Sequence, residues 1–125
     1  PRAGPSAALG GQLEGRAEMA GKEPNAAGGV NGPQLVLQIG DDACDPKQAT
    51  AVANKLVADK VVFVAGHYCS GSSIPASDIY KEAKILQITP ASTNIKLTDD
   101  AFTKGNTTVV RTFGRDDFQG PTGGA

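Results

Sequence analysis

Short apolar runs alternate with segments of helical periodicity along this chain, and few folds accommodate that order. The run "VVFVA", residues 61–65, is nearly all apolar and β-branched, as a strand buried on both faces should be. Further strands are predicted at Leu35–Ile39, Ile85–Thr89 and Thr107–Thr112. Strands that alternate with helices form βαβ units, so the sequence predicts an α/β fold with a mostly parallel sheet and helices on both faces.

The clearest helix follows Asp45-Pro46, where an N-cap acceptor precedes a proline at the first helical position. Its apolar residues recur with helical spacing and form one buried face: Ala49, Val52, Ala53, Leu56 and Val57.

Two other helices are predicted with weaker signals. A first helix covers residues 7–20, and Gly21 and Pro24 are expected to end it. A later helix is expected from Ile74-Pro75 to Ala83. Residues 90–106 are a long polar connection without a clear pattern, and connections of this length are usually functional or flexible.

Composition limits the function classes. The 125 residues, taken as one domain over 1–125, carry 12 Lys and Arg against 13 Asp and Glu, with a net charge of −1. No basic cluster is present, which argues against nucleic acid as a partner. The apolar runs are far shorter than the ~20 residues of a membrane helix, so no membrane insertion is predicted. No secretory signal is recognisable, so any such signal is expected to lie outside this sequence or to have been removed.

Two polar loops, residues 66–73 and 89–93, follow predicted strands and should therefore emerge at the same edge of the sheet, where parallel α/β sheets bind ligands. The first loop, "GHYCSGSS", could hold a nucleophile at Cys69 or Ser70. The GxSxG spacing is absent, however, and the lone histidine, His67, is too near in sequence for a triad. A catalytic nucleophile is therefore disfavoured.

The same loop could instead bind an anion, because small hydroxyl residues and free N–H groups precede a helix. The residues concerned are Ser70, Gly71, Ser72 and Ser73. The alternative is that Ser72 or Ser73 only caps the helix, and the residues alone leave both interpretations open. No Walker-type lysine follows, so a nucleotide phosphate is not indicated.

The second loop, "TPAST", offers a carbonyl at Ala91 and hydroxyls at Ser92 and Thr93. An anion bound by one loop and a cation accepted by the other would suit a zwitterion. The alternative is an ordinary proline-containing turn.

Two further sets of residues are candidates for metal or redox chemistry. Asp41, Asp42 and Asp45 lack a histidine or glutamate to complete a coordination set, so neither a metal nor another cofactor is predicted. The two cysteines, Cys44 and Cys69, are on composition alone either buried thiols or a pair.

Three blocks, "DDACDPKQA", "CSGSSIPASD" and "ITPAST", occur here in order, and together they resemble the N-terminal lobe of the periplasmic leucine/isoleucine/valine-binding proteins of bacterial ABC importers. The resemblance implies a type I periplasmic binding protein with a flavodoxin-like, Rossmann-type lobe of three αβα layers. It also implies a branched-chain amino acid ligand, a membrane permease as partner, a periplasmic location and no enzymatic activity.

Carried over residue by residue, the resemblance implies that Ser70 binds the ligand carboxylate and that Thr93 contacts both the carboxylate and the ammonium. Ala91 would accept from the ammonium through its carbonyl, and Tyr68 and Cys69 would line the side-chain pocket. Leu9 occupies a position where the family often carries an aromatic that covers the ligand. Cys44 and Cys69 match the family's disulfide pair.

The sequence also departs from the family pattern. The family's first strand is missing ahead of Gly4, and the second lobe, which supplies the closing wall of the cleft, is expected to lie outside this sequence. Three alternatives therefore remain: a structural fragment without ligand binding, a protein that binds another small amino acid or amide, and an enzyme with Cys69 as nucleophile.

Overall fold

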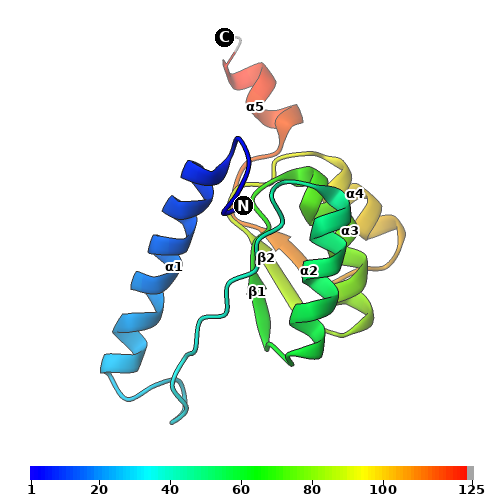
Figure 1. Ribbon diagram of the computed structural model, residues 1–125. Coiled ribbons are helices and arrows are strands. Elements are labelled where there is room, and N and C mark those ends of the chain that lie inside the picture. The colour runs from blue at the N-terminus through cyan, green and yellow to red at the C-terminus, as the bar shows by residue number, and fades with distance from the viewer. Residues whose placement is uncertain (124–125) are drawn as a thin grey trace.

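The computed structural model describes residues 1–123 and has three layers, with a parallel sheet between helices (Figure 1). The strands β1 (Phe63–Ala65), β2 (Leu86–Thr89) and β3 (Val109–Arg111) lie side by side in chain order, and both pairs are parallel. The helices are α1 (Ala7–Ala26), α2 (Pro46–Ala58), α3 (Ser70–Glu82), α4 (Lys96–Thr103) and α5 (Asp116–Gly123). The predicted α/β class is confirmed.

Helix α2 forms as its sequence signals predict. The Asp45 carboxylate accepts a hydrogen bond from the Gln48 N–H at 2.8 Å, and Pro46 occupies the first helical position. Its buried face packs on α3 and the sheet, in a core made of Ala53, Leu56, Val64, Ala76, Tyr80 and Ile85. A smaller cluster of Leu97, Ala101 and Val109 joins α4 to β3. The core therefore lies on one face of the sheet.

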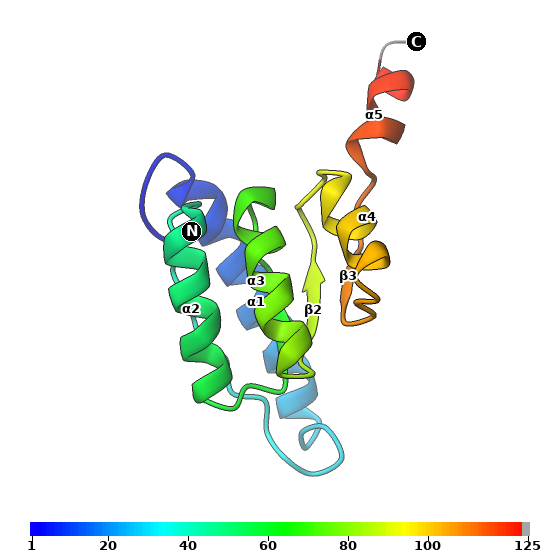
Figure 2. The same ribbon diagram turned by 90° about the vertical axis from the view of Figure 1, so that its right-hand side faces the viewer.

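Helix α1 lies on the opposite side of the sheet from α2 and α3, as the two ribbon views show (Figures 1 and 2). It makes few contacts with any other described helix or strand, and only Gly10 along it is buried. At Gly10 the Pro1 carbonyl comes so close that a Cβ would lie 1.6 Å from its oxygen, which explains glycine there. Because α1 stands away from the sheet, Phe63 of β1 is 46% exposed, and the expectation that this strand is buried on both faces is wrong.

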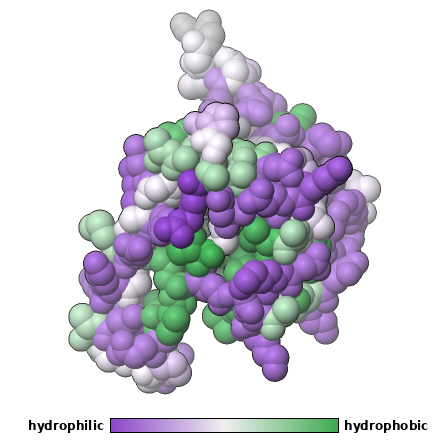
Figure 3. Space-filling view, in the orientation of Figure 1, coloured by the Kyte–Doolittle hydropathy of each residue, from purple (hydrophilic) through white to green (hydrophobic). Residues whose placement is uncertain are grey.

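The predicted strand at Leu35–Ile39 is also wrong. These residues form no hydrogen-bonded ladder with any described strand, and Val36 is 89% exposed. Figure 3 shows hydrophobic surface between α1 and the body of the molecule, on the side where this segment runs. The local sequence has strand propensity, but a strand exists only when a neighbour accepts its backbone hydrogen bonds, and none lies beside it in residues 1–123.

The bounds of two predicted helices need correction, and so does the prediction of a connection without structure at residues 90–106. Helix α1 continues through Gly21 and Pro24 to Ala26, because a proline in the last turn removes only one hydrogen bond of an exposed helix. Helix α3 begins at Ser70 rather than Ile74, since the Cys69 carbonyl accepts from the N–H groups of Ser72 and Ser73 at 3.0 and 2.9 Å. The polar connection 90–106 contains α4, whose buried Leu97 and Ala101 are four residues apart.

Candidate functional site

The two polar loops meet at the carboxyl edge of the sheet, as predicted. One connects β1 to α3 and the other connects β2 to α4. Ser92 in the second loop is 1% exposed, and its Oγ lies 2.6 Å from the Ser73 Oγ and 3.1 Å from the Tyr68 carbonyl oxygen. The Thr89 hydroxyl donates to the His67 carbonyl at 2.8 Å. Ser92 and Thr89 therefore join the loops and are not available to a ligand.

Ser70, the first residue of α3, is half-buried and faces the second loop. Its Oγ accepts a hydrogen bond from the Asn94 N–H at 3.2 Å, which leaves the hydroxyl proton free to donate. Its own N–H has no acceptor among residues 1–123 and lies at the positive end of the helix dipole. This combination suits a carboxylate.

The other serines of the loop are excluded from an open site. Ser72 and Ser73 are both fully buried. Neither is the N-cap of α3, because that position belongs to Cys69, whose side chain makes no cap hydrogen bond. The alternative of a simple serine cap is therefore wrong, and of the four residues Ser70 to Ser73 only Ser70 and Gly71 can meet a ligand.

Ala91 and Thr93 are half-buried in the loop after β2. The Ala91 carbonyl accepts no hydrogen bond from the described residues, and the Thr93 N–H likewise has no described acceptor. The Thr93 carbonyl accepts from the Asp116 N–H at 3.0 Å, which connects this loop to the start of α5. An acceptor and a donor thus remain unsatisfied next to Ser70.

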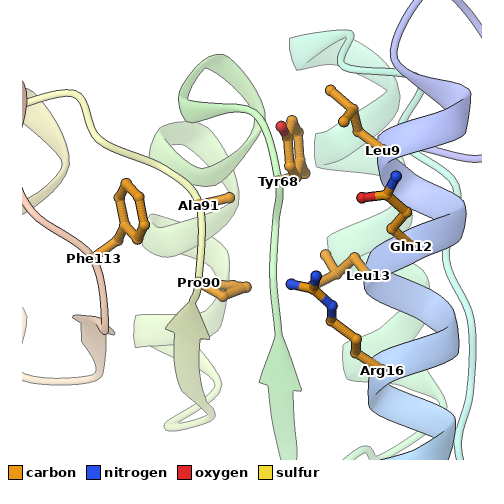
Figure 4. Close-up of a pocket in the computed structure, with 8 residues that line it drawn as sticks. All are labelled: Leu9, Gln12, Leu13, Arg16, Tyr68, Pro90, Ala91 and Phe113. Carbon is orange, nitrogen blue, oxygen red and sulfur yellow. The ribbon is translucent and has the colours of Figure 1, made fainter.

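An open cavity of about 280 Å³ separates the N-terminal half of α1 from these loops (Figure 4). Three of the predicted site residues line it: Leu9 from α1, Tyr68 from the first loop and Ala91 from the second. Its other lining residues, which sequence reasoning missed, are Gln12, Leu13, Arg16, Pro90 and Phe113. Ser70, Thr93 and Cys69 lie in the same two loops but do not line this cavity.

Cys44 and Cys69 form a disulfide with a Cα–Cα distance of 5.5 Å. The predicted pair is therefore present, and the alternative of two free thiols is wrong. A sulfur held in a disulfide has no thiolate to attack a substrate, so the reading of Cys69 as a catalytic nucleophile is wrong as well. The bridge fixes the residue before Ser70 to the loop that precedes α2.

Arg111, the last residue of β3, was not predicted to contribute. Its guanidinium donates to the Ser92 carbonyl and to the Asn94 carbonyl, both at 2.9 Å. It also donates to the Thr98 hydroxyl at 2.8 Å. Arg111 therefore holds the second loop from the side opposite the first, a role that no sequence motif indicates because it depends on β3 lying beside β2.

The acidic run before α2 is occupied by protein groups. Asp41 accepts hydrogen bonds from the Arg2 and Ala43 N–H groups, at 2.6 and 3.0 Å, and Asp45 caps α2. Asp42 is 3% exposed and its carboxylate lies 2.6 Å from the Nδ1 of His67. Within residues 1–123, no group of three or more acidic, histidine or cysteine side chains is arranged to hold a metal ion.

Asp42, His67 and Tyr80 form a buried chain of hydrogen bonds below the first loop, and sequence reasoning missed it. The His67 Nε2 lies 3.0 Å from the Tyr80 hydroxyl, and Tyr80 is fully buried. Burial alone raises the pKa of Asp42, but hydrogen bonds from His67 and from the Cys44 N–H outweigh it, so the pKa lies well below its usual range. Burial, and secondarily the negative charge of Asp42, raises the pKa of Tyr80.

Taken together, these elements form an α/β lobe with two polar loops at the carboxyl ends of parallel strands. The family model of the periplasmic binding proteins matches residues 1–124. The chain belongs to this family.

Relatives give the same assignment. The Leu/Ile/Val-binding protein of Citrobacter freundii is 53% identical over 119 residues, which cover 95% of this chain and 31% of that protein. A leucine-, isoleucine-, valine-, threonine- and alanine-binding protein of Pseudomonas aeruginosa is 50% identical over 99% of this chain and 32% of its own length. The chain therefore spans about a third of the length of these relatives.

Among solved structures, the branched-chain amino acid transporter substrate binding protein LivJ of Streptococcus pneumoniae, in complex with isoleucine, superposes with a TM-score of 0.83. It is 30% identical, and the match covers 92% of this chain and 32% of that one. The recognition and the expected fold are thereby confirmed. No helix within residues 1–123 combines the length and the apolar character needed to cross a membrane.

Proposed function

We propose that this chain is part of the substrate-binding component of a bacterial ABC importer and that it contacts the carboxylate and ammonium groups of a branched-chain aliphatic amino acid. In this role it acts in the periplasm, catalyses no reaction and delivers its ligand to a membrane permease. The Cys44–Cys69 disulfide supports the oxidising location. Residues 1–125 would correspond to the N-terminal lobe of such a component.

The observation that carries the proposal is that the two loops hold donors and an acceptor without a described hydrogen-bond partner: the Ser70 N–H, the Thr93 N–H and the Ala91 carbonyl. The Ser70 hydroxyl and N–H are both free to donate, and they lie at a helix N-terminus. A carboxylate bound there would gain charge-assisted hydrogen bonds, which are stronger than neutral ones. The Thr93 N–H, also free, is the third donor assigned to the carboxylate.

The ammonium group of the ligand is assigned to the second loop. The Ala91 carbonyl and the Thr93 hydroxyl are the acceptors, and no described residue satisfies the Ala91 carbonyl. The aliphatic side chain is assigned to the surface formed by Tyr68, Cys69 and Leu9. Two of these three residues line the open cavity of Figure 4, which is mostly apolar.

The proposed site is half of a cleft. Binding sites for small molecules usually bury most of the ligand surface, whereas this cavity is open to solvent. Affinity should therefore be weak in this chain and much higher in a protein that carries both lobes.

Isothermal titration calorimetry of the 125-residue chain with L-leucine, L-isoleucine and L-valine tests the proposal. Saturable heat is expected with at least one of the three. Leucine amide, which lacks the carboxylate, and 4-methylpentanoate, which lacks the ammonium, are matched controls and should each bind more weakly. A chain that folds but gives no saturable heat at millimolar ligand would be a structural fragment without ligand binding. Saturation only by another small amino acid or an amide would replace the proposed ligand.

A further inference from the structure

The buried chain of Asp42, His67 and Tyr80 connects three parts of the lobe. Asp42 precedes α2, His67 follows β1, and Tyr80 is on α3. Their exposed fractions are 3%, 8% and 0%. Polar side chains so deeply buried are costly unless they are fully hydrogen-bonded, so their presence calls for a reason.

The donors in this chain can be assigned. An ionised carboxylate only accepts, and the Asp42 Oδ2 lies 2.6 Å from the His67 Nδ1, so Nδ1 must carry a proton. The ring is then held on its other side by the Tyr80 hydroxyl, 3.0 Å from Nε2. The His67 ring is thus fixed between the Asp42 carboxylate, in the segment before α2, and the Tyr80 hydroxyl on α3.

The backbone of His67 is the point where both ligand loops converge. Its carbonyl oxygen lies within hydrogen-bond distance of three buried hydroxyls. These are Ser73 Oγ at 3.2 Å, Thr89 Oγ1 at 2.8 Å and Ser92 Oγ at 3.2 Å. Ser73 belongs to α3, whereas Thr89 and Ser92 belong to β2 and the loop after it. A shift of the His67 carbonyl would therefore change the spacing between the two loops.

We propose that His67 is a positioning residue for the ligand site: its ring, held by Asp42 and Tyr80, fixes its carbonyl, and the carbonyl sets the two loops at the separation that a ligand carboxylate requires. Ser70 follows His67 by three residues, and Thr93 follows Ser92 directly. His67 itself does not touch the ligand. This inference rests on the proposed function, but its mechanical part can be measured without a ligand.

The ligand-free test uses nuclear magnetic resonance on the ¹⁵N-labelled chain. The imidazole ¹⁵N shifts at pH 7 should show a proton on Nδ1 of His67. In Tyr80→Phe, which removes one buried hydroxyl, hydrogen exchange at the Ser92 and Asn94 amides, which donate to Thr89 Oγ1 and Ser70 Oγ, should speed up roughly tenfold, because the loop loses its fixed carbonyl. Ser77→Ala is the matched control, since it removes another buried hydroxyl from α3, one that donates to the Ile74 carbonyl away from the loops.

The ligand test compares L-leucine affinity across the same variants. Tyr80→Phe should weaken binding roughly 3- to 10-fold, because the loops are then less often at the separation that the ligand carboxylate requires, and Ser77→Ala should leave the affinity within about 2-fold. His67→Asn keeps an N–H that can reach Asp42 and should retain more affinity than His67→Ala. If His67→Ala does not fold, Tyr80→Phe and His67→Asn carry the comparison.

The outcomes separate the two proposals. If the unaltered chain binds no leucine, the proposed function is wrong. The amide hydrogen-exchange rates then test the role of His67 without a ligand. If Nδ1 is unprotonated, or if Tyr80→Phe changes exchange at the Ser92 and Asn94 amides no more than Ser77→Ala does, the positioning role is wrong and the buried chain serves stability only.

Discussion

In the proposed site, the Ser70 hydroxyl would be held in place before a ligand binds. The Asn94 N–H satisfies one lone pair of its oxygen, so the hydroxyl proton is directed elsewhere, and the disulfide at Cys69 fixes the residue before it. Preorganised donors of this kind lower the entropy lost on binding. Ligand affinity should therefore be sensitive to a substitution of this single residue.

Replacing Ser70 with alanine should weaken L-leucine binding by about 1 kcal/mol or more, since a charge-assisted hydrogen bond is lost. Titration calorimetry on this chain, and on a two-lobed relative with the equivalent serine replaced, measures the change. Ser77→Ala on the same helix serves as the control. Equal affinities for the Ser70→Ala and unaltered proteins would count heavily against the assignment of this residue.

The disulfide predicts a mass change and a stability change. Reduction should add two hydrogens to the intact mass, and it should lower the free energy of unfolding by roughly 3.5 kcal/mol, since the bridge closes a separation of 25 residues. Mass spectrometry with and without reductant, followed by urea denaturation, checks both. A chain whose mass does not change on reduction has no such bridge.

At the scale of elements, the strands and helices differ in how well their neighbours support them. Helices α2 and α3 pack on each other and on the sheet, whereas α1 and the extended segment Leu35–Ile39 have few or no partners. The free edge of β1 also leaves backbone groups without a neighbouring strand. Local stability should therefore fall from the β2 side of the lobe toward α1.

Amide hydrogen exchange at each element checks this gradient. The N–H groups of residues 36–39 should exchange at nearly the rate of an unfolded peptide, because no ladder protects them. In contrast, the N–H of Gln87 donates to the Thr108 carbonyl at 2.7 Å in the middle of the sheet and should be among the slowest. Strong protection at residues 36–39 would mean that they pair with a partner in solution.

At the scale of the whole molecule, the lobe has an open cavity beside α1 and a core that lies on one face of the sheet. Asp42 contributes to holding that core together, since it links the start of α2 to His67 and through it to α3. The ionisation of this one carboxyl therefore affects the stability of the whole lobe.

The free energy of unfolding should consequently decrease at acidic pH. The pKa of Asp42 is lower in the folded chain than its ordinary value of 3.8, so the folded state favours the ionised form. The resulting stabilisation is complete above about pH 5 and declines as the pH falls below the ordinary value toward the folded one. Urea denaturation at pH 7, 5 and 3 measures it. In Asp42→Asn the decline between pH 5 and 3 should be smaller, and an unchanged decline would assign it to other carboxyls.

Sequence patterns sufficed wherever the deciding contacts are local. The cap of α2 at Asp45, its periodic apolar face and the three strands β1, β2 and β3 are all indicated by short stretches, and the structure confirms them. The meeting of the loops at Ser70 and Ala91 also follows from the sequence, because parallel strands end at a common edge. The disulfide was implied by resemblance rather than by any local pattern.

What only the tertiary structure decided depends on pairs far apart in the chain. Asp42 and His67 are 25 residues apart, Ser92 and Arg111 are 19 apart, and no short motif records either contact. The strand prediction at Leu35–Ile39 is wrong for the same reason, since a strand needs a neighbouring strand that its own sequence cannot supply. The sequence by itself thus determined the class of fold and the edge of the sheet at which the two polar loops meet, whereas long-range contacts decided which residues hold those loops in shape.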